Sequence, residues 1–403
     1  MNTVFLPIIL GTDINAYGVA RSFHQAYGIK SIALGKQALP FTQNSKIVEV
    51  FTFKDFDKQD VFSNKMVEIA EKYKSTGKKL LLISCSDGYT SLITENRDLL
   101  EKYYLFNYVP LELQRQLENK KDFYEICEKY NLNYPNTYVI SKDMRNNYEV
   151  PFEFPLAVKA NDSIEYLDLD FPGKKKAYKA NNEEEYNQII NDIYNAGYSG
   201  ELIVQDYIPG DHSTMAVLNA YVDSKGKVKM MCFGKCLLDE SLPEGIGNYN
   251  ALVTQDNPEI YEMCKKFLED INYRGFANFD FKYDIRDKKY KVFEINIRQG
   301  RSSFYMTTGG CNFVTFLVDD LIYKEDKPIY YHKNEKLWLY VDPLVLKKYA
   351  NEQDKEYVKE LLANGFEFTQ WYKEDRNLKR FLNYWRRRLG TIKYYPKFQP
   401  GRD

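Results

Sequence analysis

Short apolar runs alternate with amphipathic stretches over the first hundred residues. The apolar runs lie at residues 4–10, 30–34, 46–50 and 80–84. The stretches at residues 17–27 and 62–73 carry apolar side chains at the three-to-four-residue spacing of one helix face. Strands that alternate with helices in this way predict a parallel sheet wrapped by helices, which is an α/β domain.

Two polar segments directly follow predicted strands of this sheet: residues 11–13 (GTD) and residues 86–88 (SDG). Ligands of such sheets bind beyond the carboxyl ends of the strands, so either segment could contact a ligand. The glycines do not form the G-x-G-x-x-G pattern of dinucleotide-binding domains. The sequence therefore excludes a nicotinamide-dependent enzyme.

The pattern changes near residue 111. Helical spacing recurs at residues 121–130, 183–196 and 258–271, and strand-like runs lie at residues 154–160, 201–207, 214–221, 228–236, 275–283 and 289–297. Strands without steady alternation predict an α+β domain with an antiparallel sheet. We expect domains at residues 1–110 and 111–325, followed by a C-terminal extension at 326–403. The end of that extension, residues 371–403, is basic, with ten Lys or Arg against three Asp or Glu.

Composition narrows the class of protein. The 403-residue chain has a net charge of −1, which gives no electrostatic argument for nucleic acid. No apolar stretch approaches the roughly 20 residues of a membrane helix, and the first residues lack the positive region of a signal peptide. Six cysteines are irregularly spaced, and Cys232 and Cys236 have no second Cys or His pair to complete a zinc site. These features favour a cytoplasmic enzyme with reduced thiols.

The strongest chemical pattern is FANFDFKYDIRDKKYKVFEINIRQG, residues 276–300. Both halves alternate with period two around the polar segment DIRDKK, which predicts a β-hairpin. If the hairpin folds about Asp287, Asp280 lies opposite Glu294, with Cβ atoms about 4.5–5.5 Å apart.

Asn296 shares the face of Glu294, since it follows two residues later in the strand. Two carboxylates and an amide oxygen on one face suit a Mg²⁺ ion that holds phosphate oxygens. Arg298, again on that face, could meet a developing negative charge. The alternative is a solvated hairpin face with chance acids, which the Glu-x-Asn-x-Arg order inside an apolar strand disfavours.

Three basic features are candidate phosphate contacts. Lys159 ends the apolar run FPLAVKA, where a charge is costly unless it meets an anion; an ammonium that reaches solvent is the simpler alternative. The segment GKKKAYKA, residues 173–180, could close over phosphates or be a charged surface loop, and it has too little glycine for a backbone cradle. Lys235, in CFGKCLL, could contact phosphate or be solvated.

The segment ELIVQDYIPGDHS, residues 201–213, is a candidate adenine site. Its apolar strand ends near Gln205 and turns at a Pro-Gly pair. A strand edge beside such a linker would offer backbone N–H and C=O groups to an adenine ring, and Asp211 or His212 could reach a ribose hydroxyl. A plain strand–turn–strand connection is the alternative.

These segments resemble the ATP-grasp superfamily in order and spacing over about residues 1–323: the pair Lys120/Lys121, then FPLAVKA, GKKKAYKA, LIVQDYIPGD and NFDF…FEINIR. The opening PIILGTDINAYGVARSFHQAYG is similar to the preATP-grasp domain of carboxylate–amine ligases. Together with SCSDGYT, it resembles the D-aspartate ligases of Gram-positive peptidoglycan synthesis. The resemblance implies a Rossmann-like preATP-grasp domain followed by an ATP-grasp domain of two subdomains.

The resemblance also implies roles for single residues. ATP phosphates would be contacted by Lys159 and by Lys120 or Lys121, and the adenine hinge would include Gln205, Tyr207 and Ile208. Two magnesium ions, for which Mn²⁺ is an acceptable substitute, would be held by Asp280, Glu294 and Asn296. Arg298 would stabilise the transferred phosphoryl group. The family has a Glu for ribose where this chain has Asp211-His212, and only Gly173 is left of its glycine-rich loop.

The implied reaction activates a carboxylate, whose own leaving group would be oxide. Transfer of the γ-phosphoryl group of ATP gives an acyl-phosphate, which an amine attacks to form an amide. For the D-aspartate ligases, the donor is the β-carboxylate of D-aspartate and the acceptor is the lysine side-chain amine of a UDP-linked muramyl pentapeptide.

Such substrates call for basic contacts. Candidates are Arg298, Arg301 and the C-terminal residues Arg376, Lys379, Arg380, Arg386, Arg387 and Arg388. A solvated basic helix explains the C-terminal group equally well. The alternative functions are an ATP-grasp ligase for another amino acid or peptide, and a nucleotide-binding protein without catalysis. The intact Asp280, Glu294 and Asn296 set disfavours the second.

Overall fold

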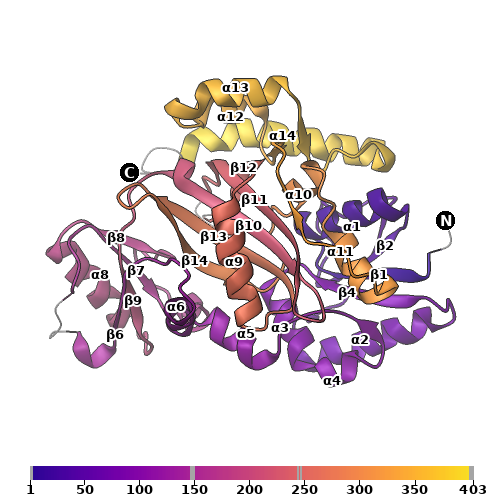
Figure 1. The fold of residues 1–403 in the computed structure, drawn as a ribbon, viewed down its shortest axis with the longest axis horizontal. Helices are drawn as coiled ribbons and strands as arrows, with labels where there is room; N and C mark the ends of the chain where they lie inside the picture. Colours follow the sequence, from indigo (N-terminus) through magenta and orange to yellow (C-terminus); the bar gives the residue numbers. More distant parts are fainter. Residues whose placement is uncertain (1–2, 146–149, 243–244, 246, 399–403) are drawn as a thin grey trace. The chain divides into compact units, whose positions relative to one another are not determined.

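The computed structural model describes residues 3–145, 150–242, 245 and 247–398 (Figure 1). Contacts separate the chain into two compact units. Unit 1 contains Met1–Leu111, His212–Phe279 and Asn296–Asp403, and unit 2 contains Glu112–Asp211 and Asp280–Ile295. The expected class is confirmed, because one sheet is parallel and two are antiparallel or mixed. The expected domain limits at residues 110 and 325 stay a prediction.

The N-terminal sheet of unit 1 is parallel, with the strand order β3-β2-β1-β4-β5. Its strands are β1 (Phe5–Leu10), β2 (Ser31–Gly35), β3 (Val48–Thr52), β4 (Lys79–Ser84) and β5 (Tyr104–Leu105). The strand order reverses between β1 and β4. The GTD and SDG segments follow these two strands, at the position where ligands of α/β sheets bind.

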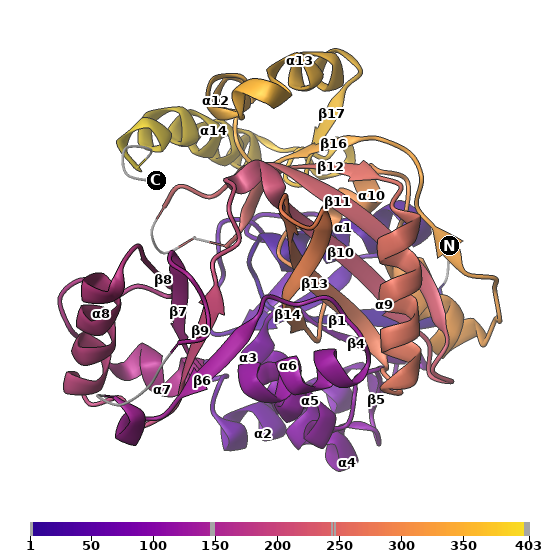
Figure 2. The same ribbon diagram turned by 60° about the vertical axis from the view of Figure 1, so that its left-hand side comes forward.

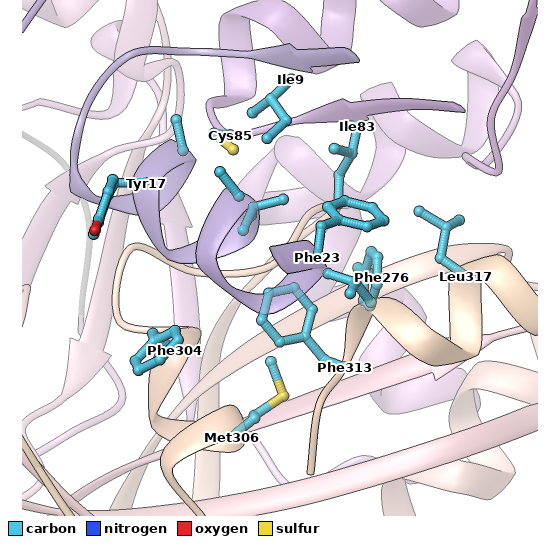
Figure 3. Packing of buried hydrophobic residues seen from close by; sticks show 14 of the residues in the cluster. Ile9, Tyr17, Phe23, Ile83, Cys85, Phe276, Phe304, Met306, Phe313 and Leu317 are labelled. Atoms are coloured by element: carbon cyan, nitrogen blue, oxygen red, sulfur yellow. The ribbon is translucent and has the colours of Figure 1, made fainter. Parts of the chain in front are cut away.

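Helices cover both faces of this sheet because its strands are apolar on both faces. Helix α1 (Ile14–Tyr27) covers one face, where Phe23 lies beside Ile83 in the apolar core that also contains Ile9 (Figure 3). The other face packs against α2 (Gln59–Lys74), α3 (Asp87–Glu95) and α4 (Arg97–Leu100). The side chain of Asp13 caps α1 by accepting a hydrogen bond from the amide of Ala16, at 3.1 Å.

An eight-stranded sheet has the order β14-β13-β10-β11-β12-β16-β17, with β15 beside β11. Its strands are β10 (Met215–Val222), β11 (Val228–Asp239), β12 (Tyr249–Gln255), β13 (Gly275–Asp284), β14 (Lys289–Asn296), β15 (Tyr330–Tyr331), β16 (Leu337–Leu339) and β17 (Phe366–Phe368). The helices of this region are α9 (Pro258–Asp270), α10 (Phe304–Thr308) and α11 (Val314–Val318). Phe304, Met306, Phe313 and Leu317 join the core of α1 (Figure 3).

The C-terminal segment is built into unit 1 by strand pairing, which the sequence did not predict. Strand β16 pairs with β12, and β17 pairs with β16. The helices α12 (Pro343–Tyr349), α13 (Lys355–Ala363) and α14 (Leu378–Phe398) pack against this part of the sheet through a separate apolar cluster. The strands are only three residues long, too short for their periodicity to be read.

Unit 2 contains a four-stranded antiparallel sheet of order β6-β9-β7-β8 (Figure 2). Its strands are β6 (Thr137–Ile140), β7 (Leu156–Ala160), β8 (Tyr178–Ala180) and β9 (Leu202–Asp206), and its helices are α5 (Leu111–Glu118), α6 (Lys120–Lys129), α7 (Ser163–Asp168) and α8 (Glu183–Asn195). Helix α8 covers one face, where Ile190 and Ile193 pack on Val158 and Val204. The far end of the β13–β14 hairpin, from Asp280 to Ile295, also belongs to unit 2.

Candidate active site

Strands β13 and β14 are neighbours in the sheet, as the predicted hairpin requires. The amide nitrogen of Asn296 donates a hydrogen bond to the amide oxygen of Asn278 at 3.1 Å across the two strands. An antiparallel register through this pair would place Asp280 across from Glu294, and that pairing stays a prediction. Asp280, Glu294 and Asn296 are partly exposed, whereas the neighbouring Phe281, Ile295 and Ile297 are buried. The acidic pair and Asn296 therefore share the polar face of the hairpin.

This face fits a magnesium ion. Its polar groups are the carboxylates of Asp280 and Glu294 and the amide of Asn296, and the hydrogen bond to Asn278 fixes which end of the Asn296 amide is its donor. Among the described residues, no group of three or more His, Cys, Asp and Glu side chains could enclose a metal. A metal here would therefore complete its shell with phosphate or water oxygens, which is how Mg²⁺ binds at nucleotide sites.

Lysines of unit 2 interact electrostatically with Glu294. The ammonium of Lys159, in β7, donates a hydrogen bond to the hydroxyl of Tyr124 at 2.8 Å, and that hydroxyl donates to the carbonyl of Phe293 at 2.8 Å. Burial lowers the pKa of Lys159 to about 7; the charge of Lys120 adds to the shift and that of Glu294 opposes it. A lysine held in this way binds an anion favourably, because an opposite charge restores its usual protonation.

The surroundings of Lys120 and Lys121 differ. Burial lowers the pKa of Lys120, whose charge acts on Glu294 and on Lys176 of the predicted phosphate loop. Lys121 instead forms an ion pair of 2.9 Å with Glu201. Lys120 is therefore the member of the pair whose charge acts on Lys159, and its contact with ATP stays a prediction.

Lys282 is a candidate that the sequence reasoning missed. It lies in β13 two residues after Asp280, and burial lowers its pKa to about 8, while Asp211 opposes the shift. Its ammonium lies 5.1 Å from the ring centre of Tyr207, and that of Lys179 lies 5.0 Å from the same ring. The sequence could have shown it, because a lysine two residues after Asp280 lies on the same face of the strand as Asp280.

The adenine segment differs from the expected strand edge. Strand β9 pairs with β6 on one side and with β7 on the other, so the backbone around Gln205 is used within the sheet. The side chain of Gln205 is buried and donates to Thr137 at 2.7 Å, and the amide of Tyr207 donates to the carbonyl of Pro155. The expectation of an open strand edge is therefore wrong, and a nucleotide base would use the backbone beyond Tyr207, beginning at Ile208.

Two candidates lie in unit 1 with carboxylate partners. The ammonium of Lys235, in β11, lies 2.8 Å from a carboxylate oxygen of Asp354. The Nδ1 atom of His212 lies 3.7 Å from a carboxylate oxygen of Asp239. These contacts give both residues a structural role, and their nucleotide contacts stay predictions.

Arg298 belongs to a charged group at the switch point of the parallel sheet. Its guanidinium lies 2.7 Å from the carboxylate of Asp87, which opens α3 after β4. On the other side of the switch point, burial raises the pKa of Asp13, and the charges of Arg301 and Arg298 oppose that shift. The predicted catalytic residue Arg298 therefore interacts with both segments predicted to contact a ligand, residues 11–13 and 86–88, within unit 1.

A cavity of about 460 Å³ opens in unit 1 beside Arg301 and Ile14, between α14 and the ends of β16 and β17. The guanidinium of Arg301 lies 4.3 Å from the ring centre of Tyr340, and Arg387 donates a hydrogen bond to the hydroxyl of the same tyrosine at 2.5 Å. Neither arginine forms an ion pair within the described part of the chain. Among the described residues of the lining one is acidic, Glu240, and it accepts hydrogen bonds from the amides of Ser241 and Leu242.

Comparison with known proteins shows the family of the chain. No protein-family model matches it. A D-aspartate ligase from Enterococcus faecium (strain Aus0004) is 45% identical over 395 residues, which cover 94% of this chain and 93% of that protein. The chain belongs to the D-aspartate ligase family. The predicted resemblance is thus confirmed, and members of this family are ATP-dependent carboxylate–amine ligases of the ATP-grasp superfamily.

Solved structures agree on the fold. An N5-carboxyaminoimidazole synthetase from Staphylococcus aureus, complexed with ADP, has a TM-score of 0.59 at 14% identity and covers 83% of this chain and 82% of its own. An L-amino acid ligase from Bacillus licheniformis has a TM-score of 0.56 at 12% identity, with coverage of 79% and 74%. A biotin carboxylase domain from Hydrogenobacter thermophilus, solved with MgADP, has a TM-score of 0.57 at 15% identity, with coverage of 82% and 72%.

Within the described residues, no helix is both long and apolar enough to cross a bilayer. All six cysteines are buried and free, and burial raises the pKa of Cys85 well above the usual value. A thiol in that state is a poor nucleophile.

The lowered pKa of Lys159 predicts that this D-aspartate ligase family member takes up a proton when it binds ATP. In the protein without ATP, Lys159 has a pKa of about 7. Phosphate oxygens beside it would return this pKa toward the usual lysine value of about 10.4. Between these two values binding takes up a proton, so ATP affinity should fall as the pH rises above 7, by up to about tenfold per pH unit.

Calorimetric titrations with ATP, at about one pH unit above the pKa of Lys159 in two buffers of different ionisation enthalpy, measure this uptake. In Lys159→Arg the guanidinium stays charged, so the uptake should fall to the part supplied by Lys120. Equal uptake in the variant, or none in the unmodified protein, would contradict the assignment.

Proposed function

We propose that this protein joins the β-carboxylate of D-aspartate to the lysine side-chain amine of a UDP-linked muramyl pentapeptide, a peptidoglycan precursor, with release of ADP and phosphate. The D-aspartate ligase that is 45% identical over nearly both full lengths carries this proposal. The groups found in each unit supply the charges that the reaction requires.

The nucleotide is assigned to unit 2. Lys120 and Lys159 contact the phosphates, with Lys176 and Lys282 as further cations, because this group has more positive charge than Glu294 can balance. The hinge near Tyr207 and Ile208 takes the base, the buried Gln205 supports it from β9, and Asp211 takes the ribose. This set of lysines favours ATP over a neutral ligand, because several buried cations are stabilised only by an anion.

Magnesium is assigned to Asp280, Glu294 and Asn296, with two ions as the proposed number and Mn²⁺ as a substitute. When bound, the metal would neutralise charge on the phosphate oxygens. The residues of the chain do the positioning. Tyr124 holds Lys159 beside β14, and Asn278 holds the amide of Asn296.

The γ-phosphoryl group passes to the carboxylate of the donor, which gives an acyl-phosphate with a good leaving group. Arg298, held by Asp87, stabilises the transferred group through charge-assisted hydrogen bonds. The amine of the acceptor then attacks the acyl carbon, the acyl–oxygen bond breaks, and phosphate leaves. Excluding water protects the acyl-phosphate from hydrolysis.

The acceptor is assigned to the cavity beside Arg301, Tyr340 and Arg387. Arginine forks bind carboxylate and phosphate groups in pairs of hydrogen bonds, and the acceptor has both. About 460 Å³ is within the roughly 300–1,000 Å³ of sites for drug-sized molecules and more than a four-carbon amino acid fills. The alternative is that this cavity takes the donor.

Glu294→Gln should abolish phosphate release in the presence of both substrates. The change keeps the size of the side chain and removes the charge beside Lys159, so we expect a loss in kcat of about 10²–10³-fold or more. Asp287→Asn, in the exposed turn of the same hairpin, is the matched control and should keep its activity. Turnover of Glu294→Gln near that of the unmodified protein would refute the metal assignment.

A substrate panel tests the proposed reaction. ATP hydrolysis would be measured with D-aspartate, L-aspartate, D-glutamate and neutral amino acids, each together with UDP-muramyl pentapeptide. The masses of the products would be measured by mass spectrometry. We expect D-aspartate to be preferred and the product to contain one new amide. Preference for L-aspartate or for a neutral amino acid would remove the donor assignment and leave the ATP-dependent ligase in place.

Arg387→Gln should raise the KM for the acceptor by about 10–100-fold, which corresponds to the loss of a hydrogen bond to a charged group. Arg387→Lys should be intermediate, because lysine keeps the charge and loses the fork. Lys393→Gln, exposed on the same helix, is the matched control. If the KM for D-aspartate rises instead of that for the acceptor, the cavity belongs to the donor.

A further inference from the structure

Helix α14 exposes an unusual number of apolar side chains. Twelve large hydrophobic side chains are exposed in the described part of the chain, and six of them lie on this one helix: Leu378, Phe381, Leu382, Trp385, Leu389 and Phe398. Single exposed hydrophobic residues are ordinary, but a group of them on one element marks an interaction surface.

The exposed residues form a stripe along the helix. Leu378, Leu382, Trp385 and Leu389 follow one another at the i, i+4, i+7, i+11 spacing of one helix face. Another face of the helix is anchored in unit 1, since Tyr384 and Tyr395 are buried in the apolar cluster of α12 and α13. The stripe is exposed on a helix that is already held in place.

A row of basic residues runs beside this stripe: Lys379, Arg386, Lys393 and Lys397, all exposed. The first three are seven residues apart and the fourth follows four residues later, so all four share one face of the helix. None of the four forms an ion pair within the described part of the chain, whereas Arg380 and Arg388 of the same helix pair with Asp375 and Asp342. Helix α14 contains no Asp or Glu.

We propose that the outer face of α14, defined by the Leu378–Leu389 stripe and this basic row, binds the surface of an anionic lipid bilayer. Helices that lie in a membrane interface have this composition, with Leu and aromatic residues on one side and Lys or Arg beside them. Tryptophan is enriched at that depth because its ring is apolar and its N–H group is polar.

Charge distinguishes this occupant from a second copy of the chain. A two-fold symmetric dimer would bring two identical stripes together, and with them two rows of uncompensated positive charge. An anionic bilayer instead compensates every one of these charges. The binding is peripheral, in keeping with the finding that no described helix can cross a bilayer.

The test is sedimentation of the full-length protein with vesicles of phosphatidylcholine, with and without phosphatidylglycerol. We expect binding to the anionic vesicles only, and weaker binding as salt is raised, because salt screens exposed charges. Removing one basic residue by Lys393→Gln or Lys397→Gln should weaken binding about fivefold, the effect of one basic residue near an anionic surface.

The apolar stripe is tested with Leu382→Glu/Leu389→Glu. This double variant should lose binding by more than about tenfold, because it places two like charges at the lipid surface, while its ligase turnover and melting temperature stay unchanged. The matched control is Leu344→Glu, since Leu344 is equally exposed, at 62%, but lies on α12. Brominated lipid should quench the fluorescence of Trp385, which is exposed, and spare that of the buried Trp338.

Three outcomes would overturn the proposal. The first is an absence of binding to anionic vesicles by the folded protein. The second is equal binding of Leu382→Glu/Leu389→Glu and the unmodified protein. The third is a dimer in sedimentation velocity that this double variant converts to a monomer, which would assign the stripe to self-association.

Discussion

The period-two alternation of the β13–β14 hairpin is the constraint on which the arrangement of catalytic groups depends. One face of the hairpin must be apolar, because Phe279, Phe281, Ile295 and Ile297 are buried in the protein. All side chains at the intervening positions then point to the other face. A shift of one residue would move Asp280 and Glu294 to the face of these apolar side chains, so the apolar core also fixes the position of the acidic residues.

The lysines of unit 2 give this hairpin its electrostatic context. Lys120, Lys159 and Lys176 influence one another's charge, and Glu294 is the carboxylate that opposes them. Holding like charges together costs folding free energy, and that cost falls when a polyanion binds. Tyr124 is central to this arrangement, since its hydroxyl links the ammonium of Lys159 to the backbone beside Glu294.

Helix α14 shows how one element can serve two surfaces. Its inner side contributes Arg387 and Tyr394 to the cavity of unit 1, and its outer side carries the leucine stripe and the basic row. The arginine run at residues 386–388 is divided by the helical turn, so neighbouring arginines face different surroundings. Arg388 pairs with Asp342, Arg387 contacts Tyr340, and Arg386 is exposed.

The sequence by itself determined the local patterns. Alternation of strands and helices predicted the parallel sheet, period two predicted the hairpin and its acidic face, and the order of the motifs predicted the family. Such inferences succeed because they depend on residues close together in the chain, where side-chain direction follows from the backbone.

The tertiary structure decided what depends on distant partners. It placed β9 between two strands, separated Lys120 from Lys121, added Lys282 to the cation group and divided the basic C-terminal segment into an inner and an outer face. Strand neighbours, burial and ion pairs are set by segments tens to hundreds of residues apart. For that reason the spacing of residues predicted which groups carry the ATP chemistry, and only packing showed which charges each of them meets.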